Sequence, residues 1–522
     1  MLAKSYSATV DGINAIPVTI EVQVTPRKGD SKETRMVIVG LPDSSVKESY
    51  SRVEAALYNS GFGNPPQDIT VNLAPGDIRK EGTGFDLPIA IGILMANCLT
   101  SSTSSEHYML LGELSLDGSL QPIRGALPIA IKAREMGYEG LIVPEQNVHE
   151  AAVVNRLKVY GAKNLRQVVN FFSGDEKALS PTVIDTRAEF YAHQYDFDLD
   201  FADVKGQDNV KRAFEIAAAG GHNLIMVGPP GAGKSMMARR LPSILPPLSL
   251  SESLETTQIH SVAGQLKGNT GLITERPFRS PHHTVSQVAL VGGGTNPMPG
   301  EISLAHNGVL FLDELPEFPR ASLEVLRQPL EDRKITVTRA KYSIEYPSNF
   351  MFVASMNPCP CGYYNHPTKP CQCTPGQIHK YLNKISGPLL DRIDLQVELV
   401  AVPFSDLSKL APGEPSSVIR ERVIKARQIQ EARFKDVKGI HCNAQMTERM
   451  LHQFAEPDAA SMDMLRMAME RLKLSARAYS RILKVARTIA DLEGSEQVQS
   501  QHIAEAIGYR NLDRGDWAER GI

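Results

Sequence analysis

A short run of small residues that ends in lysine and serine is the part of this sequence best suited to chemistry. Residues 228–235 read Gly-Pro-Pro-Gly-Ala-Gly-Lys-Ser, a complete G-x-x-x-x-G-K-[ST] loop between an apolar run and a helical pattern. Glycines let backbone N–H groups face phosphate oxygens. The lysine contacts the β and γ phosphates, and the serine hydroxyl ligates Mg²⁺. We therefore predict a binding site for a nucleoside triphosphate. Its predicted residues are Gly228, Pro229, Pro230, Gly231, Ala232, Gly233, Lys234, Ser235 and Met236.

Polar residues also close two later apolar runs, as they do at the carboxyl ends of buried parallel strands. Asp313 and Glu314 follow the run 309–312. We expect Asp313 and Ser235 to hold Mg²⁺ and Glu314 to polarise the attacking water. Two acids after a strand also suit a helix N-cap with a solvated neighbour, but the phosphate loop favours the catalytic interpretation. Asn357 follows a third run and is either an ordinary turn residue or a ligand of γ-phosphate and water.

Arg392 follows a turn of small residues at 386–388. It forms a surface ion pair, or it reaches the γ-phosphate bound to a neighbouring subunit and stabilises the charge of the transition state.

The segment 334–346 alternates on both sides of a short turn, which predicts a β-hairpin. Residues 320–341 carry six Lys or Arg against three acids, although the whole chain has a formal net charge of −3. By charge alone this is a solvated hairpin. The alternative hypothesis is that Arg339 and Lys341 contact DNA phosphates.

Four of the six cysteines cluster as two C-x-C pairs. Four thiolates complete a tetrahedral zinc site, which orders a loop that buries little core. Free thiols or a redox pair are the alternatives, because C-x-C departs from the usual C-x-x-C spacing. The predicted structural zinc ligands are Cys359, Cys361, Cys371 and Cys373.

The chain has 522 residues, which suits about three domains. Hydrophobic residues make up 42% and charged residues 22%, and neither a signal peptide nor a membrane span is evident, so we expect a cytoplasmic protein. The fold class is α/β. We predict an α/β domain over 1–172, a linker over 173–200, a nucleotide core over 201–402 and a helical lid over 403–522.

The ordered motifs resemble those of AAA+ ATPases. More narrowly, residues 276–283 (Arg-Pro-Phe-Arg-Ser-Pro-His-His) and 300–314 resemble the magnesium-chelatase-like branch and its YifB/ComM family over essentially the whole chain. The resemblance implies that Asn357 is the first sensor, Arg392 the arginine finger and Arg477 the second sensor. It also implies a homo-hexameric ring whose sites lie at subunit interfaces, and a long insertion over 251–308 that points toward the pore.

Residues 112–125, with 80–90 before them, are similar to the proteolytic domain of Lon proteases and to the ribosomal S5-like fold. Those proteases use a serine nucleophile that a lysine activates. Gly84 and Leu127 stand at the matching positions, and neither can do this chemistry. The N-terminal domain is therefore predicted to be inactive and to serve DNA binding or ring assembly.

Three functions compete. The family resemblance implies a DNA motor with helicase or branch-migration activity on single-stranded or branched DNA, which would aid integration of transforming DNA. The alternatives are a magnesium-chelatase motor subunit and a protein-remodelling ATPase or protease. The missing nucleophile counts against a protease, and the added N-terminal domain counts against a chelatase.

Overall fold

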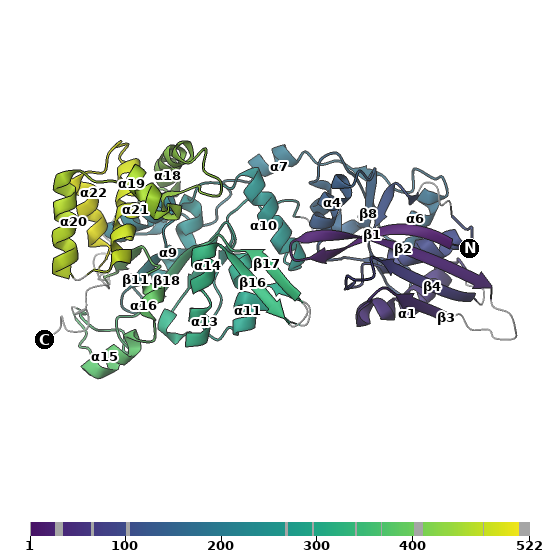
Figure 1. Ribbon diagram of the computed structural model, residues 1–522, viewed down its shortest axis with the longest axis horizontal. Helices are drawn as coiled ribbons and strands as arrows, with labels where there is room; N and C mark the ends of the chain where they lie inside the picture. The colour runs from purple at the N-terminus through teal and green to yellow at the C-terminus, as the bar shows by residue number, and fades with distance from the viewer. Residues whose placement is uncertain are drawn as a thin grey trace. The chain divides into compact units, whose positions relative to one another are not determined.

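The computed structural model describes ten stretches of the chain, which form two compact units (Figure 1). Unit 1 is Met1–His193 with Ser249–Thr274, and unit 2 is Gln194–Leu248 with Glu275–Ile522. The described residues are 2–26, 35–63, 67–100, 105–266, 270–294, 297–339, 342–366, 368–400, 411–472 and 474–510.

Unit 1 contains two four-stranded sheets, ordered β1-β2-β4-β3 and β10-β9-β8-β5, and a small β6–β7 ladder. In the first sheet β2 pairs antiparallel with β1 and β4, while β3 runs parallel to β4. The strands are β1 (Leu2–Asp11), β2 (Asn14–Pro26), β3 (Arg35–Val39), β4 (Gln67–Ala74), β5 (Tyr108–Leu110), β6 (Glu113–Leu114), β7 (Leu120–Gln121), β8 (Gly140–Pro144), β9 (Lys158–Ala162) and β10 (Pro181–Thr182).

One helix of unit 1, α2 (Asp86–Ala96), is buried on every side because nearly all of its residues are apolar. Asp86 lies in its first turn and accepts a hydrogen bond of 2.6 Å from Arg52 Nε, so the one buried charge is paired. The other helices are α1 (Ser44–Asn59), α4 (Ala126–Glu135), η1 (Glu145–Asn147), α5 (Val148–Ala152), α6 (Leu165–Phe172), α7 (Thr186–Ala192) and α10 (Leu250–Val262).

Unit 2 is built on a five-stranded sheet in the order β12-β15-β18-β11-β19, in which all neighbouring strands are parallel. The strands are β11 (Leu224–Val227), β12 (Phe278–Arg279), β15 (Val309–Leu312), β18 (Met351–Met356) and β19 (Leu395–Glu398), with the hairpin strands β13 (Gly292–Gly293), β14 (Met298–Pro299), β16 (Lys334–Arg339) and β17 (Tyr342–Pro347). The predicted hairpin and the mixed α/β class with a parallel sheet are confirmed.

Helices flank this sheet, and the described part of the C-terminal segment is helical, as predicted (Figure 1). The helices are η2 (Phe201–Asp203), α8 (Asp208–Gly220), α9 (Lys234–Arg240), η3 (Leu241–Ile244), α11 (Gln287–Val291), α12 (Glu301–Leu304), η4 (Leu315–Glu317), α13 (Arg320–Glu324), α14 (Arg327–Asp332), α15 (Pro375–Leu382), α16 (Gly387–Leu390), α18 (Ser416–Arg433), η5 (Asn443–Gln445), α19 (Glu448–Phe454), α20 (Ala459–Leu472), α21 (Ala476–Leu492) and α22 (Ser500–Gly508). Among the described residues, no helix has the length and apolarity needed to cross a bilayer.

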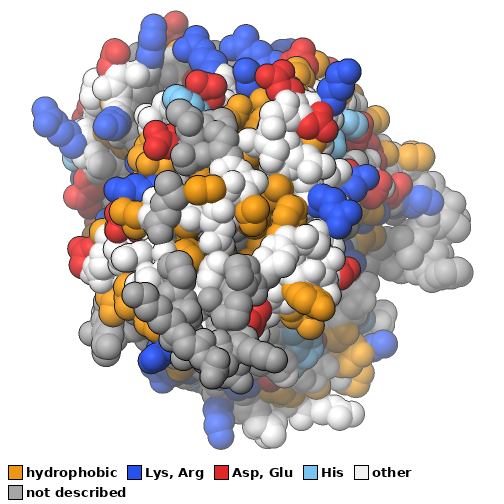
Figure 2. All heavy atoms as spheres, turned by 90° about the vertical axis from the view of Figure 1, so that its right-hand side faces the viewer, with side chains coloured by type: hydrophobic (Ala, Val, Ile, Leu, Met, Phe, Trp, Pro, Cys, Tyr) orange, Lys and Arg blue, Asp and Glu red, His pale blue; other side chains and the backbone are white. Residues whose placement is uncertain are grey.

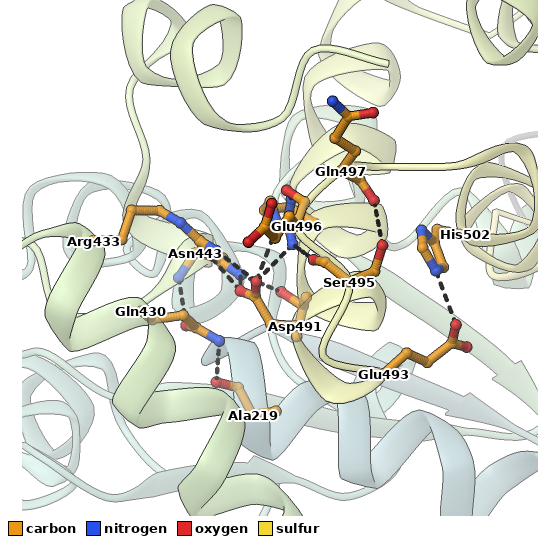
Figure 3. A network of polar contacts seen from close by, with 12 residues as sticks. Ala219, Gln430, Arg433, Asn443, Asp491, Glu493, Ser495, Glu496, Gln497 and His502 are labelled. Atoms are coloured by element: carbon orange, nitrogen blue, oxygen red, sulfur yellow. Dashed lines mark hydrogen bonds and ion pairs between the residues drawn. The ribbon is translucent and has the colours of Figure 1, made fainter. Parts of the chain in front are cut away.

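A buried polar network joins the C-terminal helices to α8 (Figure 3). Asp491 on α21 pairs with Arg433 on α18 at 2.5 Å and accepts a hydrogen bond of 2.8 Å from Asn443 Nδ2. Gln430 accepts from the Asn443 backbone N–H and donates to the Ala219 carbonyl at the end of α8. Removing one member of such a network leaves a buried charge unpaired, so the helices and the sheet layer depend on each other.

Two predicted boundaries differ from this division. The helix α10 follows the phosphate-loop helix in the chain, within the range predicted as nucleotide core, but it packs on α4 in unit 1. The Ser261 hydroxyl at its end donates to the buried Glu150 carboxylate, which also accepts from the Leu127 N–H at 2.9 Å. In the segment predicted as a linker, residues 181–182 and 186–192 form β10 and α7.

We predict that Ser261→Ala destabilises unit 1 by about 1–3 kcal/mol, because it removes one donor from a buried carboxylate. The unfolding transition of unit 1, followed by hydrogen exchange of α4 and α10, measures the change. Ser251→Ala is the control, since Ser251 is exposed on the same helix. Equal stability of the two variants would contradict the prediction.

Candidate nucleotide site

The phosphate loop lies between the carboxyl end of β11 and the start of α9. Gly231 and Gly233 adopt φ values of 78° and 89°, in the left-handed region that favours glycine. A Cβ on Gly228 would lie 2.7 Å from the carbonyl oxygen of Leu399, so only glycine fits there against the residue that follows β19. The loop therefore has the conformation that turns backbone N–H groups toward an anion.

Lys234 is 9% exposed and lies within the loop. Its Nζ donates to the carbonyls of Gly228 and Pro229 at 2.6 and 3.0 Å and to Asn357 Oδ1 at 3.0 Å. Burial lowers the pKa of Lys234, while Asp313 and Glu314 act against that shift. The structure thus brings the predicted sensor Asn357, which follows β18, to the predicted phosphate-binding lysine at the start of α9.

Oxygen atoms gather beside the loop. Ser235 Oγ donates to Asp313 Oδ2 at 2.5 Å, and the Ser355 hydroxyl donates to the other carboxylate oxygen. A hydroxyl and a carboxylate oxygen are ligands that suit Mg²⁺, so Ser235 and Asp313 fit the predicted cation role. The sequence analysis did not identify Ser355. The signal that could have identified it is that Ser355 carries the only hydroxyl group within the run 351–356.

Glu314 follows Asp313 in a left-handed backbone conformation with φ of 54°, and its side chain is 55% exposed. His283 Nδ1 lies 3.8 Å from its carboxylate. A mostly exposed carboxylate next to the Asp313 oxygens can reach a water molecule. His283 belongs to the quoted motif 276–283, but no role was predicted for it.

Arg276 and Arg279 of that motif have structural contacts. The Arg276 guanidinium donates to the carbonyls of Pro246 and Asn307 at 2.6 and 2.7 Å. Arg279 forms a bidentate pair with Glu301 at 2.6 and 2.7 Å. Both arginines fix the chain before β15, and His283 follows on the same segment.

The predicted arginine finger lies at the opposite edge of the sheet. Arg392 precedes β19, and its carbonyl accepts from Asn223 Nδ2, which precedes β11. Asp394, beside Arg392, accepts from the Asn223 N–H at 3.1 Å. Since β11 and β19 are parallel, these residues lie at the amino edge, whereas the phosphate loop lies at the carboxyl edge, about 13 Å away for a four-residue strand.

Arg477 lies at that same amino edge. It pairs with Asp391 at 2.9 Å and lines, with Arg392, a cavity of about 250 Å³. Arg481 pairs with Asp394 at 3.0 Å in the same region. Although burial acts in the opposite direction, the charge of Arg481 holds the pKa of Asp394 below its usual range. Burial lowers the pKa of Lys484, which also lines the cavity, to about 8.

Arg392 itself is 7% exposed. It is paired with Glu331 and donates to the Pro388 carbonyl at 2.6 Å, and its buried Nε has no hydrogen-bond partner among the described residues. Within one chain, therefore, Arg392 and Arg477 lie together but away from Lys234.

The four clustered cysteines lie close together. Their sulfur atoms are all within 4.8 Å of one another. Cys359 Sγ lies 3.3 Å from Cys361 Sγ and 3.7 Å from Cys371 Sγ. Tetrahedral Zn–S bonds of about 2.3 Å place sulfur atoms roughly 3.8 Å apart, so this spacing suits a Cys₄ metal site. The cluster is thus one that can bind a metal ion.

The predicted DNA contacts are only partly described. The hairpin β16–β17 carries Ile335 and Val337 on a buried face, and Tyr346 Oη donates to the Pro297 carbonyl at 2.8 Å. Lys341 and the Arg339 side chain lie outside the described residues. Of the insertion 251–308, residues 251–274 belong to unit 1 and the remainder to unit 2.

In unit 1 the positions that match the Lon dyad carry no nucleophile or base. Leu127 is buried at the start of α4 and Gly84 precedes α2. Lys80 is fully buried and donates to the carbonyls of Pro75 and Ile78, so it is not a surface charge. Its role here is structural.

Figure 2 looks onto unit 1, where basic and acidic side chains are interspersed with apolar ones. The edge strand β3 and the residues after it expose Val37, Val39 and Leu41. A mixed surface of this kind differs from the basic stripe of a nucleic-acid platform.

Comparisons with known proteins cover almost the whole chain. The profile "Magnesium chelatase, subunit ChlI" matches residues 200–407, "Magnesium chelatase, subunit ChlI C-terminal" matches 413–510, and "Subunit ChlI of Mg-chelatase" matches 20–147. Competence protein ComM of Haemophilus influenzae is 44% identical over 515 residues, covering 98% of both chains. The chain belongs to the YifB/ComM family.

This family of magnesium-chelatase-like AAA+ ATPases also includes the uncharacterized protein YifB of Escherichia coli, 43% identical over 96% of each chain. Lon protease 2 of Bacillus subtilis is 32% identical over 159 residues, 28% of this chain and 27% of its own length. The YifB/ComM assignment and the likeness to Lon proteases agree with the sequence interpretation.

For this YifB/ComM family member we predict that Ser355→Ala lowers kcat for ATP hydrolysis about tenfold or more, since Asp313 loses a charge-assisted hydrogen bond. ATP affinity should stay unchanged, whereas Lys234→Ala should abolish binding. Steady-state hydrolysis and fluorescent-nucleotide titration measure both. Ser417→Ala, exposed on α18, is the control. Wild-type turnover in Ser355→Ala would contradict the role of Ser355.

Proposed function

We propose that this chain is the subunit of a hexameric, ATP-driven DNA motor with helicase or branch-migration activity that promotes integration of DNA during natural transformation. The carrying observation is the separation of the predicted catalytic residues. Lys234, Asp313 and Asn357 lie at one edge of the sheet, and Arg392 and Arg477 lie at the other. A complete hydrolysis site then requires two subunits.

Each residue of the loop edge has a defined task. Lys234 and the loop N–H groups bind the phosphates, and Asn357 orients the γ-phosphate and the water. Glu314 polarises that water and takes its proton, which its exposure permits. Ser235 and Asp313 would hold Mg²⁺, which would neutralise part of the phosphate charge.

The arginines act on the nucleotide of the next subunit. Arg392 leaves Glu331 and Arg477 leaves Asp391 when the neighbouring γ-phosphate offers a stronger anionic partner. Arginine fingers of this kind are worth about 10³–10⁵ in kcat in other nucleotide hydrolases. Hydrolysis then depends on ring assembly.

Mixing inactive variants tests this arrangement. We predict that Lys234→Ala mixed with Arg392→Ala regains ATPase activity, because the first variant supplies its arginines to the intact loop of the second. Lys234→Ala mixed with Arg477→Ala should regain activity for the same reason. A mixture of Arg392→Ala and Arg477→Ala should stay inactive, since one neighbour must supply both residues. Activity in that last mixture would show instead that Arg477 acts within its own subunit.

DNA as the substrate is supported by the name of the H. influenzae relative, a competence protein, and by the basic hairpin. Arg339 and Lys341 contact DNA phosphates, and unit 1, an inactive Lon- and S5-like domain, assists DNA binding or ring assembly. The protein works in the cytoplasm, where transforming DNA meets the chromosome.

We predict that the double variant Arg339→Ala/Lys341→Ala loses the stimulation of ATP hydrolysis by DNA but keeps basal hydrolysis. Lys435→Ala, exposed outside the hairpin, is the control. Strand displacement on forked and four-way DNA then tests motor activity directly. If DNA still stimulates ATP hydrolysis in the double variant, the proposed DNA contacts of Arg339 and Lys341 are refuted. If DNA does not stimulate ATP hydrolysis by the wild-type chain, a chelatase motor or a protein remodeller is favoured. The chelatase motor is the second candidate function because the magnesium-chelatase profiles match this chain.

Zinc completes the proposal. The sulfur atoms of Cys359, Cys361 and Cys371 lie 3.3–3.7 Å from one another. With Cys373 they supply four ligands and leave no open position for a substrate, so the ion is structural. Metal analysis of the purified chain should find about one zinc per subunit.

A further inference from the structure

The four clustered cysteines lie in the segment that follows the predicted sensor Asn357. Cys359 follows Asn357 by two residues and is fully buried, whereas the other three cysteines are half-buried. The segment 359–373 then returns to the nucleotide site through α15, which begins at Pro375 directly after the last cysteine and Thr374. Any displacement of the cluster is therefore transmitted along only two residues to Asn357.

The turn at Gly362, beside Cys361 of the cluster, packs against the phosphate loop. The Gly362 N–H donates to the Cys359 carbonyl at 3.0 Å, and Gly362 has φ of 84°. A Cβ on Gly362 would lie 2.6 Å from Cδ of Pro230 and 3.9 Å from Cγ of Asn357. The turn thus touches the phosphate loop and the sensor at once, and it can do so only as glycine.

The other side returns through α15. A capping box of Thr374 and Gln377 fixes the start of this helix next to Cys373. Tyr381, 6% exposed on α15, lies near Asn357: burial raises the pKa of its hydroxyl, and the backbone of Asn357 acts against that shift. Asn357 is therefore held from two directions, by segments that the cysteines join.

The cysteine sulfurs connect the two segments that lie beside Asn357. The segment 359–373 is rich in proline and polar residues and has little apolar surface of its own to bury. Four sulfur atoms at these distances repel one another as thiolates, and a bound dication turns that repulsion into a cross-link. Without the ion, no disulfide joins the described residues of the two sides.

We propose that zinc in this cluster acts as a brace for the nucleotide site: metal occupancy holds Asn357 and Pro230 in position for hydrolysis, so that loss of zinc stops turnover while ATP still binds. This inference rests on the proposed ATPase activity and on the zinc site. It makes the cluster a point at which metal availability controls the motor.

The full-length protein tests the brace with two variants and two controls. Cys371→Ser/Cys373→Ser should lose its zinc, lower kcat about tenfold or more and keep ATP affinity within about threefold. Gly362→Ala should keep its zinc and still lose turnover, because the added Cβ displaces the turn from Pro230. Gly376→Ala is the matched control, since a Cβ there meets nothing within 4 Å. Cys98→Ser is the cysteine control outside the cluster.

Zinc per chain, ATP-analogue affinity and hydrogen exchange of residues 228–235 are measured beside hydrolysis. Removing zinc from the wild type with a chelator should raise exchange in that loop, and adding zinc back should reverse the change. Wild-type protein without zinc would overturn the metal site. Full turnover and unchanged exchange in the zinc-free double variant would overturn the brace alone. A zinc-loaded wild type that hydrolyses no ATP would refute the motor, and the exchange experiment would then still decide whether zinc orders the loop.

Discussion

The direction of the five parallel strands is the constraint on which the rest of unit 2 depends. Because all neighbouring strands run the same way, every loop that follows a strand meets at one edge of the sheet. That edge gathers Lys234, Asp313 and Asn357. Residues that precede strands are sent to the other edge, and Arg392 is among them. One short sheet thus separates the predicted arginines of a chain from its own phosphate loop.

Buried polar contacts hold the amino edge in place. His222 is fully buried, and it contacts Asp394 at 3.3 Å and Thr488 of α21 at 2.8 Å. Burial lowers the pKa of His222, so the ring stays neutral and serves as a hydrogen-bonding link. With the Asp491 network, these contacts couple the helix that carries Arg477 to the strand edge. A movement of the C-terminal helices therefore moves the arginines as well.

Local patterns predicted the parts of the site that local physics determines. The phosphate loop, the acids after β15 and the β16–β17 hairpin each depend on residues adjacent in the chain, and the grouping of four cysteines follows from their spacing. Ser355, His283 and the shared position of Arg392 and Arg477 depend on which strands become neighbours, and that information lies in long-range packing. The burial of Lys80 depends on long-range packing in the same way, because a lysine is recognised as buried only when the surrounding carbonyls are known.

The most instructive difference is the place of α10. The chain leaves the phosphate-loop helix α9, passes through η3 and enters unit 1, where Ser261 completes the partners of Glu150. Since Glu150 is nearly buried, an N-terminal fragment ending near residue 193 would lack a donor that its own core requires. Unit 1 is therefore not an independent module placed before an ATPase. It is folded partly from the segment that follows the nucleotide loop, so the two units are joined by three chain connections rather than one.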